Sequence, residues 1–93
     1  FDAQEALKIG LVQAVFPADK LIAGARELSA KIIANAPLAV AYCKAAIDRG
    51  LQEDFDRAQA QEIDAASILF STEDKREGLT AFVEKRKPTY KGR

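Results

Sequence analysis

The stretch TEDKREGLTAFVEKRKP, residues 72–88, decides the class of fold that this sequence specifies. Ser71 or Thr72 supplies a side chain that can cap a helix, and the carboxylates of Glu73 and Asp74 fall in the first turn, near the positive end of the helix dipole. Apolar residues then recur at helical spacing, and Pro88 ends the pattern. The stretch therefore predicts an amphipathic helix.

The end of this predicted helix combines aromatic and basic side chains. Phe82 lies on its apolar face, and residues 85–87 place three cations in its last turn. Cations there stabilise the negative end of the dipole, which is the simpler interpretation. A phosphate contact is the alternative, because cations beside Phe82 and Tyr90 suit a ligand with both charge and a flat ring, such as a nucleotide. Local pattern alone leaves both interpretations open.

Alanine-rich patterns extend the helical prediction over the rest of the chain. Eighteen alanines against fourteen Ile, Val and Thr favour helix over strand. Helices are predicted over residues 2–9, 19–35, 37–50 and 52–70, the first with the spacing of a capping box at Asp2 and Glu5. The largely apolar stretch Leu11–Phe16 is the one strand candidate. The predicted fold class is mainly α, a small multi-helix domain with at most one short strand near the N-terminus.

Composition argues against several classes of function. The 93 residues contain no histidine, which removes the most common general base and every histidine-containing metal set. Fourteen basic and fourteen acidic residues give no overall basic field for nucleic acid. The longest apolar run, residues 36–43, is far shorter than the roughly twenty residues of a membrane span. The single Cys43 points to a reducing compartment. We expect no metal site and no nucleic-acid or membrane partner.

Charge is unevenly distributed along the chain. Residues 48–77 contain four basic and nine acidic side chains, whereas residues 78–93 contain five basic and one acidic side chain. The carboxylates of Glu73, Asp74 and Glu77 are predicted to be solvated, because they fall in a helix first turn or on a polar face. No carboxylate in the chain is predicted to be catalytic.

Several motifs closely resemble the C-terminal third of the enoyl-CoA hydratase/isomerase (crotonase) family. They are, in order, DAQEALKIGLV at 2–12, VFP at 15–17, NAPLA at 35–39, KAAI at 44–47 and the stretch 72–88. The resemblance covers essentially the whole chain. It implies that residues 1–17 are the end of the family's spiral core and that residues 18–93 form its C-terminal helical oligomerisation domain. The start at Phe1 rather than Met fits this expectation of a piece of a longer protein.

The resemblance also implies a function. The chain would be the oligomerisation and CoA-contacting segment of a hydratase of trans-2-enoyl-CoA in fatty-acid or related acyl-CoA metabolism. The family's catalytic glutamates and oxyanion-hole amides belong to earlier segments, so the chain alone would be inactive. In family hydratases the final helix brings a Phe and a Lys to the CoA of a neighbouring subunit. These residues match Phe82 and Lys85 in the FVEK motif.

The implied partners are neighbouring subunits, in a homotrimer or a dimer of trimers, and acyl-CoA. Coenzyme A would enter as the thioester substrate, with no tightly bound cofactor. The implied location is the cytoplasm, or the mitochondrion if the source is eukaryotic. The alternative interpretation is a free-standing helical interaction module without catalytic function.

Overall fold

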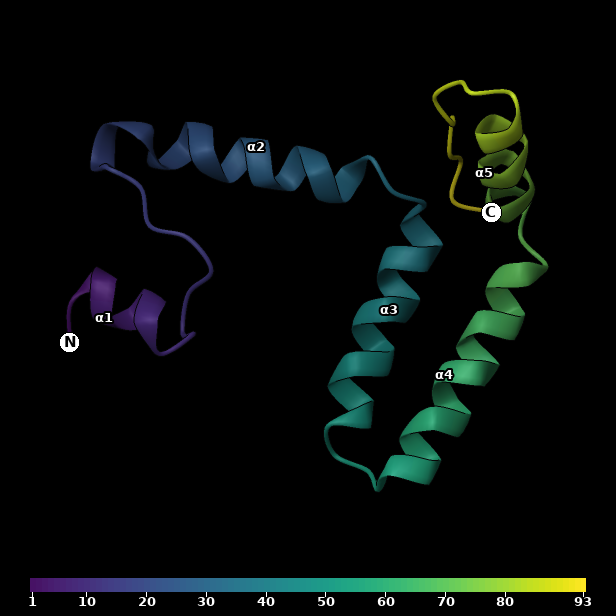
Figure 1. Cartoon of the computed structure of the whole chain (residues 1–93), viewed down its shortest axis with the longest axis horizontal. Helices are drawn as coiled ribbons and strands as arrows, with labels where there is room; N and C mark the ends of the chain where they lie inside the picture. The colour runs from purple at the N-terminus through teal and green to yellow at the C-terminus, as the bar shows by residue number, and fades with distance from the viewer. The chain divides into compact units, whose positions relative to one another are not determined.

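The structure, a computed structural model, describes residues 1–93 and contains helices joined by loops, with no strand (Figure 1). In chain order the elements are α1 (Ala3–Lys8), the short 3-10 helix η1 (Ala18–Lys20), α2 (Leu21–Ile33), α3 (Pro37–Gly50), α4 (Phe55–Phe70) and α5 (Glu73–Val83). The predicted mainly α fold class is confirmed.

The strand candidate Leu11–Phe16 is irregular in the structure. A strand needs a neighbouring strand to satisfy its backbone groups, and this chain supplies none. Its first residues instead bond back to the preceding helix, because the backbone N–H groups of Leu11 and Val12 donate to the carbonyl oxygen of Ala6 at 2.9 and 3.4 Å.

Local signals place most helix ends correctly. Asp2 and Glu5 form the predicted capping box, with each side chain accepting a hydrogen bond from the other residue's backbone N–H. Pro37 occupies the first turn of α3, as expected, and α3 ends at Gly50. Helix α4 begins three residues later than predicted, because Asp54 caps it by accepting from the Arg57 N–H at 3.0 Å.

The chain forms two compact units, residues 1–32 and residues 33–93. The first unit holds α1, η1 and most of α2. Within it, the ring of Phe16 packs so closely on Gly24 that a Cβ atom there would lie 2.5 Å from the Phe16 Cε1 atom. The predicted boundary after residue 17 concerns a longer parent protein and remains a prediction.

The second unit consists of the α3–α4 hairpin, α5 and the C-terminal tail. Helices α3 and α4 run side by side (Figure 1). They approach closely at their turn end, where a Cβ atom on Gly50 would lie 3.4 Å from the Ala58 Cβ. Residues 89–93 fold back along α5 and bond to its first turns. This arrangement positions the C-terminal end of α5.

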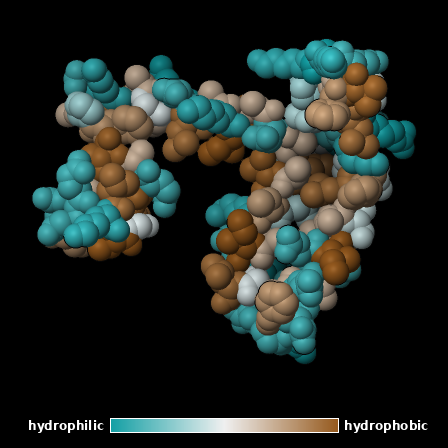
Figure 2. All heavy atoms as spheres, in the orientation of Figure 1, coloured by the Kyte–Doolittle hydropathy of each residue, from teal (hydrophilic) through white to brown (hydrophobic).

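Very little apolar surface is buried within either unit. The buried apolar side chains are Ala6 in the first unit and Ala81 in the second. Large apolar side chains instead face solvent, and Figure 2 shows them along α3 and α4. The helical spacing of Phe55, Ile63 and Phe70 predicts that these side chains face inward, and this prediction is wrong, because each of the three is at least 61% exposed.

No single helix is long and apolar enough to cross a membrane. The segment Ala18–Ile33 and α3 reach the required length and apolar composition only when they are counted together, as two helices with a sharp bend between them.

Candidate functional site

The predicted contact residues Phe82 and Lys85 both lie at the C-terminal end of α5. Phe82 is on the last turn of the helix and is 83% exposed. Lys85 follows the C-cap residue Glu84 and is also exposed. Its ammonium group makes no ion pair, so it is available to an anion. The structure therefore brings a bare aromatic ring and a free cation to one end of one helix.

Lys85 ends α5 in a conformation that is unusual for a side chain larger than glycine. Its φ of 53° lies in the left-handed region, and it is the one non-glycine residue in the chain with positive φ. The Lys85 N–H donates to the Phe82 carbonyl at 3.2 Å, and the Arg86 N–H donates to the Ala81 carbonyl at 3.0 Å. These two bonds make a Schellman motif, in which glycine usually takes the position of Lys85.

Arg86 is not available to a ligand in the same way as Lys85. Its guanidinium donates two hydrogen bonds to the Glu77 carboxylate, at 2.6 and 2.9 Å, and a further one to Glu84. Glu77 also accepts from the Thr89 N–H at 2.8 Å. The hydrogen bonds from Arg86 lower the pKa of Glu77 to about 2, and the bond from Thr89 is the second-largest cause of this shift. The pairing of Glu77 and Arg86 also raises the pKa of Arg86. This ion pair ties the turn after α5 to the middle of the helix.

A second carboxylate fixes the tail to the start of α5. Asp74 is only 3% exposed, and its two oxygens accept from the backbone N–H groups of Lys91 and Gly92, both at 2.7 Å. Its own N–H donates to the carbonyl oxygen of Arg93 at 3.0 Å. Gly78 leaves room for Tyr90, since a Cβ atom there would lie 3.1 Å from the Tyr90 hydroxyl oxygen. The tail is therefore a bonded part of the second unit.

Two details of this region differ from the sequence-based expectation. The helix ends at Val83, so residues 85–87 lie beyond its last turn rather than within it. Their role as simple compensation for the helix dipole is correspondingly weaker, because that effect falls off outside the terminal turn. Asp74 was expected to be solvated like Glu73, and it is buried instead. Nothing in the local sequence separates these two neighbours, because the groups that bury Asp74 lie seventeen and eighteen residues away.

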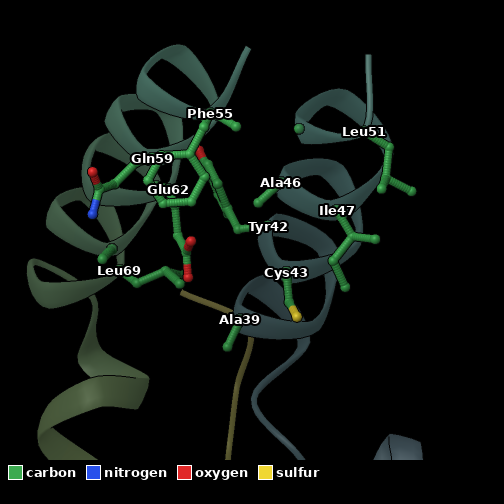
Figure 3. A pocket seen from close by; sticks show the side chains of 14 residues that line it. Ala39, Tyr42, Cys43, Ala46, Ile47, Leu51, Phe55, Gln59, Glu62 and Leu69 are labelled. Atoms are coloured by element: carbon green, nitrogen blue, oxygen red, sulfur yellow. The ribbon is translucent and has the colours of Figure 1, made fainter. Parts of the chain in front are cut away.

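A groove with a volume of about 520 Å³ runs between α3 and α4 (Figure 3). Small or apolar side chains form most of its walls, and the polar ones are Tyr42, Cys43, Gln59 and Glu62. Figure 3 shows the Tyr42 side chain extending from α3 toward α4. In the whole structure no group of three or more Cys, Asp or Glu side chains is arranged to hold a metal ion. The groove has the character of a packing surface.

Comparison with known proteins agrees with the motifs. A sequence profile described as Enoyl-CoA hydratase/isomerase matches residues 1–93. A short-chain-enoyl-CoA hydratase of Clostridium acetobutylicum is 51% identical over 85 residues, which is 91% of this chain and 33% of that protein. A crotonyl-CoA hydratase of Syntrophomonas wolfei is 42% identical over 96% of this chain and 34% of its own length.

Solved structures give the same picture. A crystal structure of an enoyl-CoA hydratase from Bacillus anthracis matches with a TM-score of 0.94 and 44% identity, over 98% of this chain and 35% of that one. An enoyl-CoA hydratase/isomerase from Mycobacterium paratuberculosis matches with a TM-score of 0.95 and 35% identity, over all of this chain and 37% of that one. The chain thus spans about a third of the length of its relatives. Because the family profile covers every residue, this chain belongs to the enoyl-CoA hydratase/isomerase family.

Proposed function

We propose that this chain is the C-terminal oligomerisation and CoA-contacting segment of an enoyl-CoA hydratase. In this proposal its exposed apolar faces pack on the rest of the parent and on neighbouring subunits, in a homotrimer or a dimer of trimers. Phe82 and Lys85 contact the coenzyme A part of the substrate. The parent acts in the cytoplasm, or in the mitochondrion of a eukaryotic source. The chain on its own is inactive, because the groups that would activate water lie in segments to which it has no counterpart.

The observation that carries the packing part of the proposal is the exposure of large apolar side chains within each unit. In the first unit Ile22 is 64% exposed, and the buried apolar side chain is Ala6. In the second unit the buried apolar side chain is Ala81. Contiguous exposed apolar faces of this kind are typical of surfaces that pack on another protein or another part of the same protein. Exposed Phe55, Ile63 and Phe70 on α4 supply apolar side chains of the kind that fill protein interfaces.

The CoA part of the proposal is supported by the chemistry at the end of α5. Coenzyme A offers phosphate groups and a flat adenine ring. Lys85 offers an unpaired ammonium for a phosphate, and the exposed ring of Phe82 offers an apolar face for a flat group. Arg86 contributes to the shape of the site, since its guanidinium is already bonded to Glu77 and Glu84.

Two measurements on the chain test this proposal. Size-exclusion chromatography with light scattering should show self-association, and Ile63→Lys on the exposed face of α4 should weaken it. The matched control Gln52→Lys adds the same charge in the α3–α4 turn and should leave association unchanged. A compact monomer that binds no dye for apolar surface would contradict the packing role and favour a free-standing module. A crotonyl-CoA hydration assay should show no turnover, and appreciable turnover would contradict the predicted inactivity.

A further inference from the structure

We infer that Glu77 is a positioning residue for the coenzyme A contact of Lys85, because its carboxylate holds the turn that presents the Lys85 side chain. This inference rests on the proposed function above. It concerns a residue that touches neither the proposed ligand nor Lys85 itself. Glu77 acts instead on Arg86 and Thr89, which are the two ends of the short segment that follows Lys85.

The turn at Lys85 needs an external hold. A non-glycine residue in the left-handed region is strained, because its Cβ atom lies too close to the following carbonyl oxygen. Only two backbone hydrogen bonds, from Lys85 to Phe82 and from Arg86 to Ala81, close the turn from within. The bond from Lys85 to Phe82 joins two exposed residues, so water competes for its groups, and Arg86, the donor of the second bond, is also exposed. Without further contacts the turn would fray, and the backbone at Lys85 would no longer hold the side chain in one place.

Glu77 supplies that hold through two contacts. Its bidentate pair with Arg86 fixes the residue that directly follows Lys85 and that closes the Schellman motif. Its bond from the Thr89 N–H fixes the chain after Pro88. Glu77 is half-buried, and paired hydrogen bonds between guanidinium and carboxylate combine strength with a fixed geometry. One carboxylate on the middle of α5 thus fixes the segment on the far side of Lys85.

The arrangement separates two roles among neighbouring cations. Arg86 is neutralised by Glu77 and Glu84, so it shapes the turn without competing for the anion. Lys85 keeps its charge free. Substitution of Glu77 should therefore weaken coenzyme A binding only when Lys85 is present. A residue with a general role in folding would not show that dependence.

The test is a titration of the ¹⁵N-labelled chain with coenzyme A at constant ionic strength, followed by NMR because weak binding is expected. Lys85→Ala should weaken binding about three- to fivefold, the size expected for one exposed charge pair. Glu77→Ala should weaken it about twofold or more. The double variant should bind no more weakly than Lys85→Ala alone. The matched control Glu73→Ala removes another paired glutamate of α5 and should leave the affinity unchanged.

The intraresidue NOE between the amide and α protons of Lys85 gives a second readout, because these protons lie unusually close together only when φ is positive. The NOE should weaken in Glu77→Ala and stay unchanged in Glu73→Ala. Glu77→Gln, which keeps the shape of the side chain and an acceptor for Thr89, provides a milder variant if Glu77→Ala fails to fold. Its affinity should fall between those of the wild type and Glu77→Ala.

The outcomes separate the inference from the proposed function. If Lys85→Ala weakens binding and Glu77→Ala does not, the inference is wrong and the CoA contact stands. If the losses from Glu77→Ala and Lys85→Ala add in full, Glu77 acts independently of Lys85 and the inference is also wrong. If coenzyme A leaves the signals of Phe82 and Lys85 unmoved, the CoA contact is refuted, and the positioning role falls with it.

Discussion

Replacing Lys85 with glycine should stabilise this protein, although it removes the residue proposed to bind coenzyme A. The left-handed φ of 53° is strained for lysine and free of strain for glycine. Relief of that strain is worth about 1 to 2 kcal/mol. The greater conformational freedom of glycine in the unfolded chain offsets about 0.5 to 1 kcal/mol of that stabilisation. The expected net gain in the free energy of unfolding is therefore roughly 0.5 to 1 kcal/mol.

The assay is thermal and urea unfolding of the chain, followed by circular dichroism. For a protein of this size the gain corresponds to a rise in the melting temperature of about 2 to 8 °C. The matched control is Lys87→Gly, which removes the same charge and adds the same glycine two residues later, where φ is not positive. Lys87→Gly should be neutral or destabilising by up to about 1 kcal/mol.

Equal effects of the two glycines on stability would refute the reasoning, because only the backbone conformation distinguishes their positions. A stabilised Lys85→Gly that also binds coenzyme A less tightly would connect the two properties of this position. Residues held in sparsely populated backbone regions often occur at functional sites, where selection retains a side chain at a cost in stability. Lys85 would then be such a residue.

Three of the contacts described above can each be tested by substitution. The pKa of Glu77 is about 2 in the folded chain, against an ordinary value of 4.5. The ionised Glu77 carboxylate should therefore contribute fully to stability above pH 4.5, and this contribution should disappear as the pH falls toward 2. Glu77→Gln should remove that part of the pH dependence of urea unfolding. Asp74→Ala should cost about 2 to 3 kcal/mol and expose the tail to trypsin, and Asp74→Asn, which keeps one acceptor, should cost less. Gly24→Ala should destabilise the first unit by about 1 to 3 kcal/mol through its clash with Phe16, whereas Gly50→Ala, with ordinary contact distance, should be neutral or stabilising in the same unfolding experiment.

Capping signals were the most predictable part of this fold, because each depends on residues three or four positions apart. The capping box at Asp2 and Glu5, the position of Pro37 and the cap at Thr72 follow from such local spacing and agree with the structure. The proposed contact residues could be named only through the FVEK motif. Composition and charge had favoured dipole compensation as the simpler interpretation and had left phosphate binding as the alternative.

Long-range contacts could not be read from the sequence. The burial of Asp74 depends on a tail that returns after seventeen residues, and the pairing of Glu77 with Arg86 spans nine. The outcome for Phe55, Ile63 and Phe70 was missed for a different reason. Helical periodicity identifies an apolar face correctly, but it does not reveal whether the partner that covers the face belongs to the same chain.

The size of the proposed site has a consequence for assembly. One exposed ring and one exposed ammonium together contribute about 2 kcal/mol, which alone corresponds to a dissociation constant of tens of millimolar. Phe82 and Lys85 would therefore form part of a site, and the rest of the affinity would come from residues on whatever packs against the apolar faces of this chain. In that case assembly and coenzyme A binding are linked, so that each strengthens the other by the same factor. Ile63→Lys would then weaken coenzyme A binding in the assembled protein without touching the ligand, whereas Lys85→Ala would weaken assembly in the presence of coenzyme A and leave it unchanged in its absence.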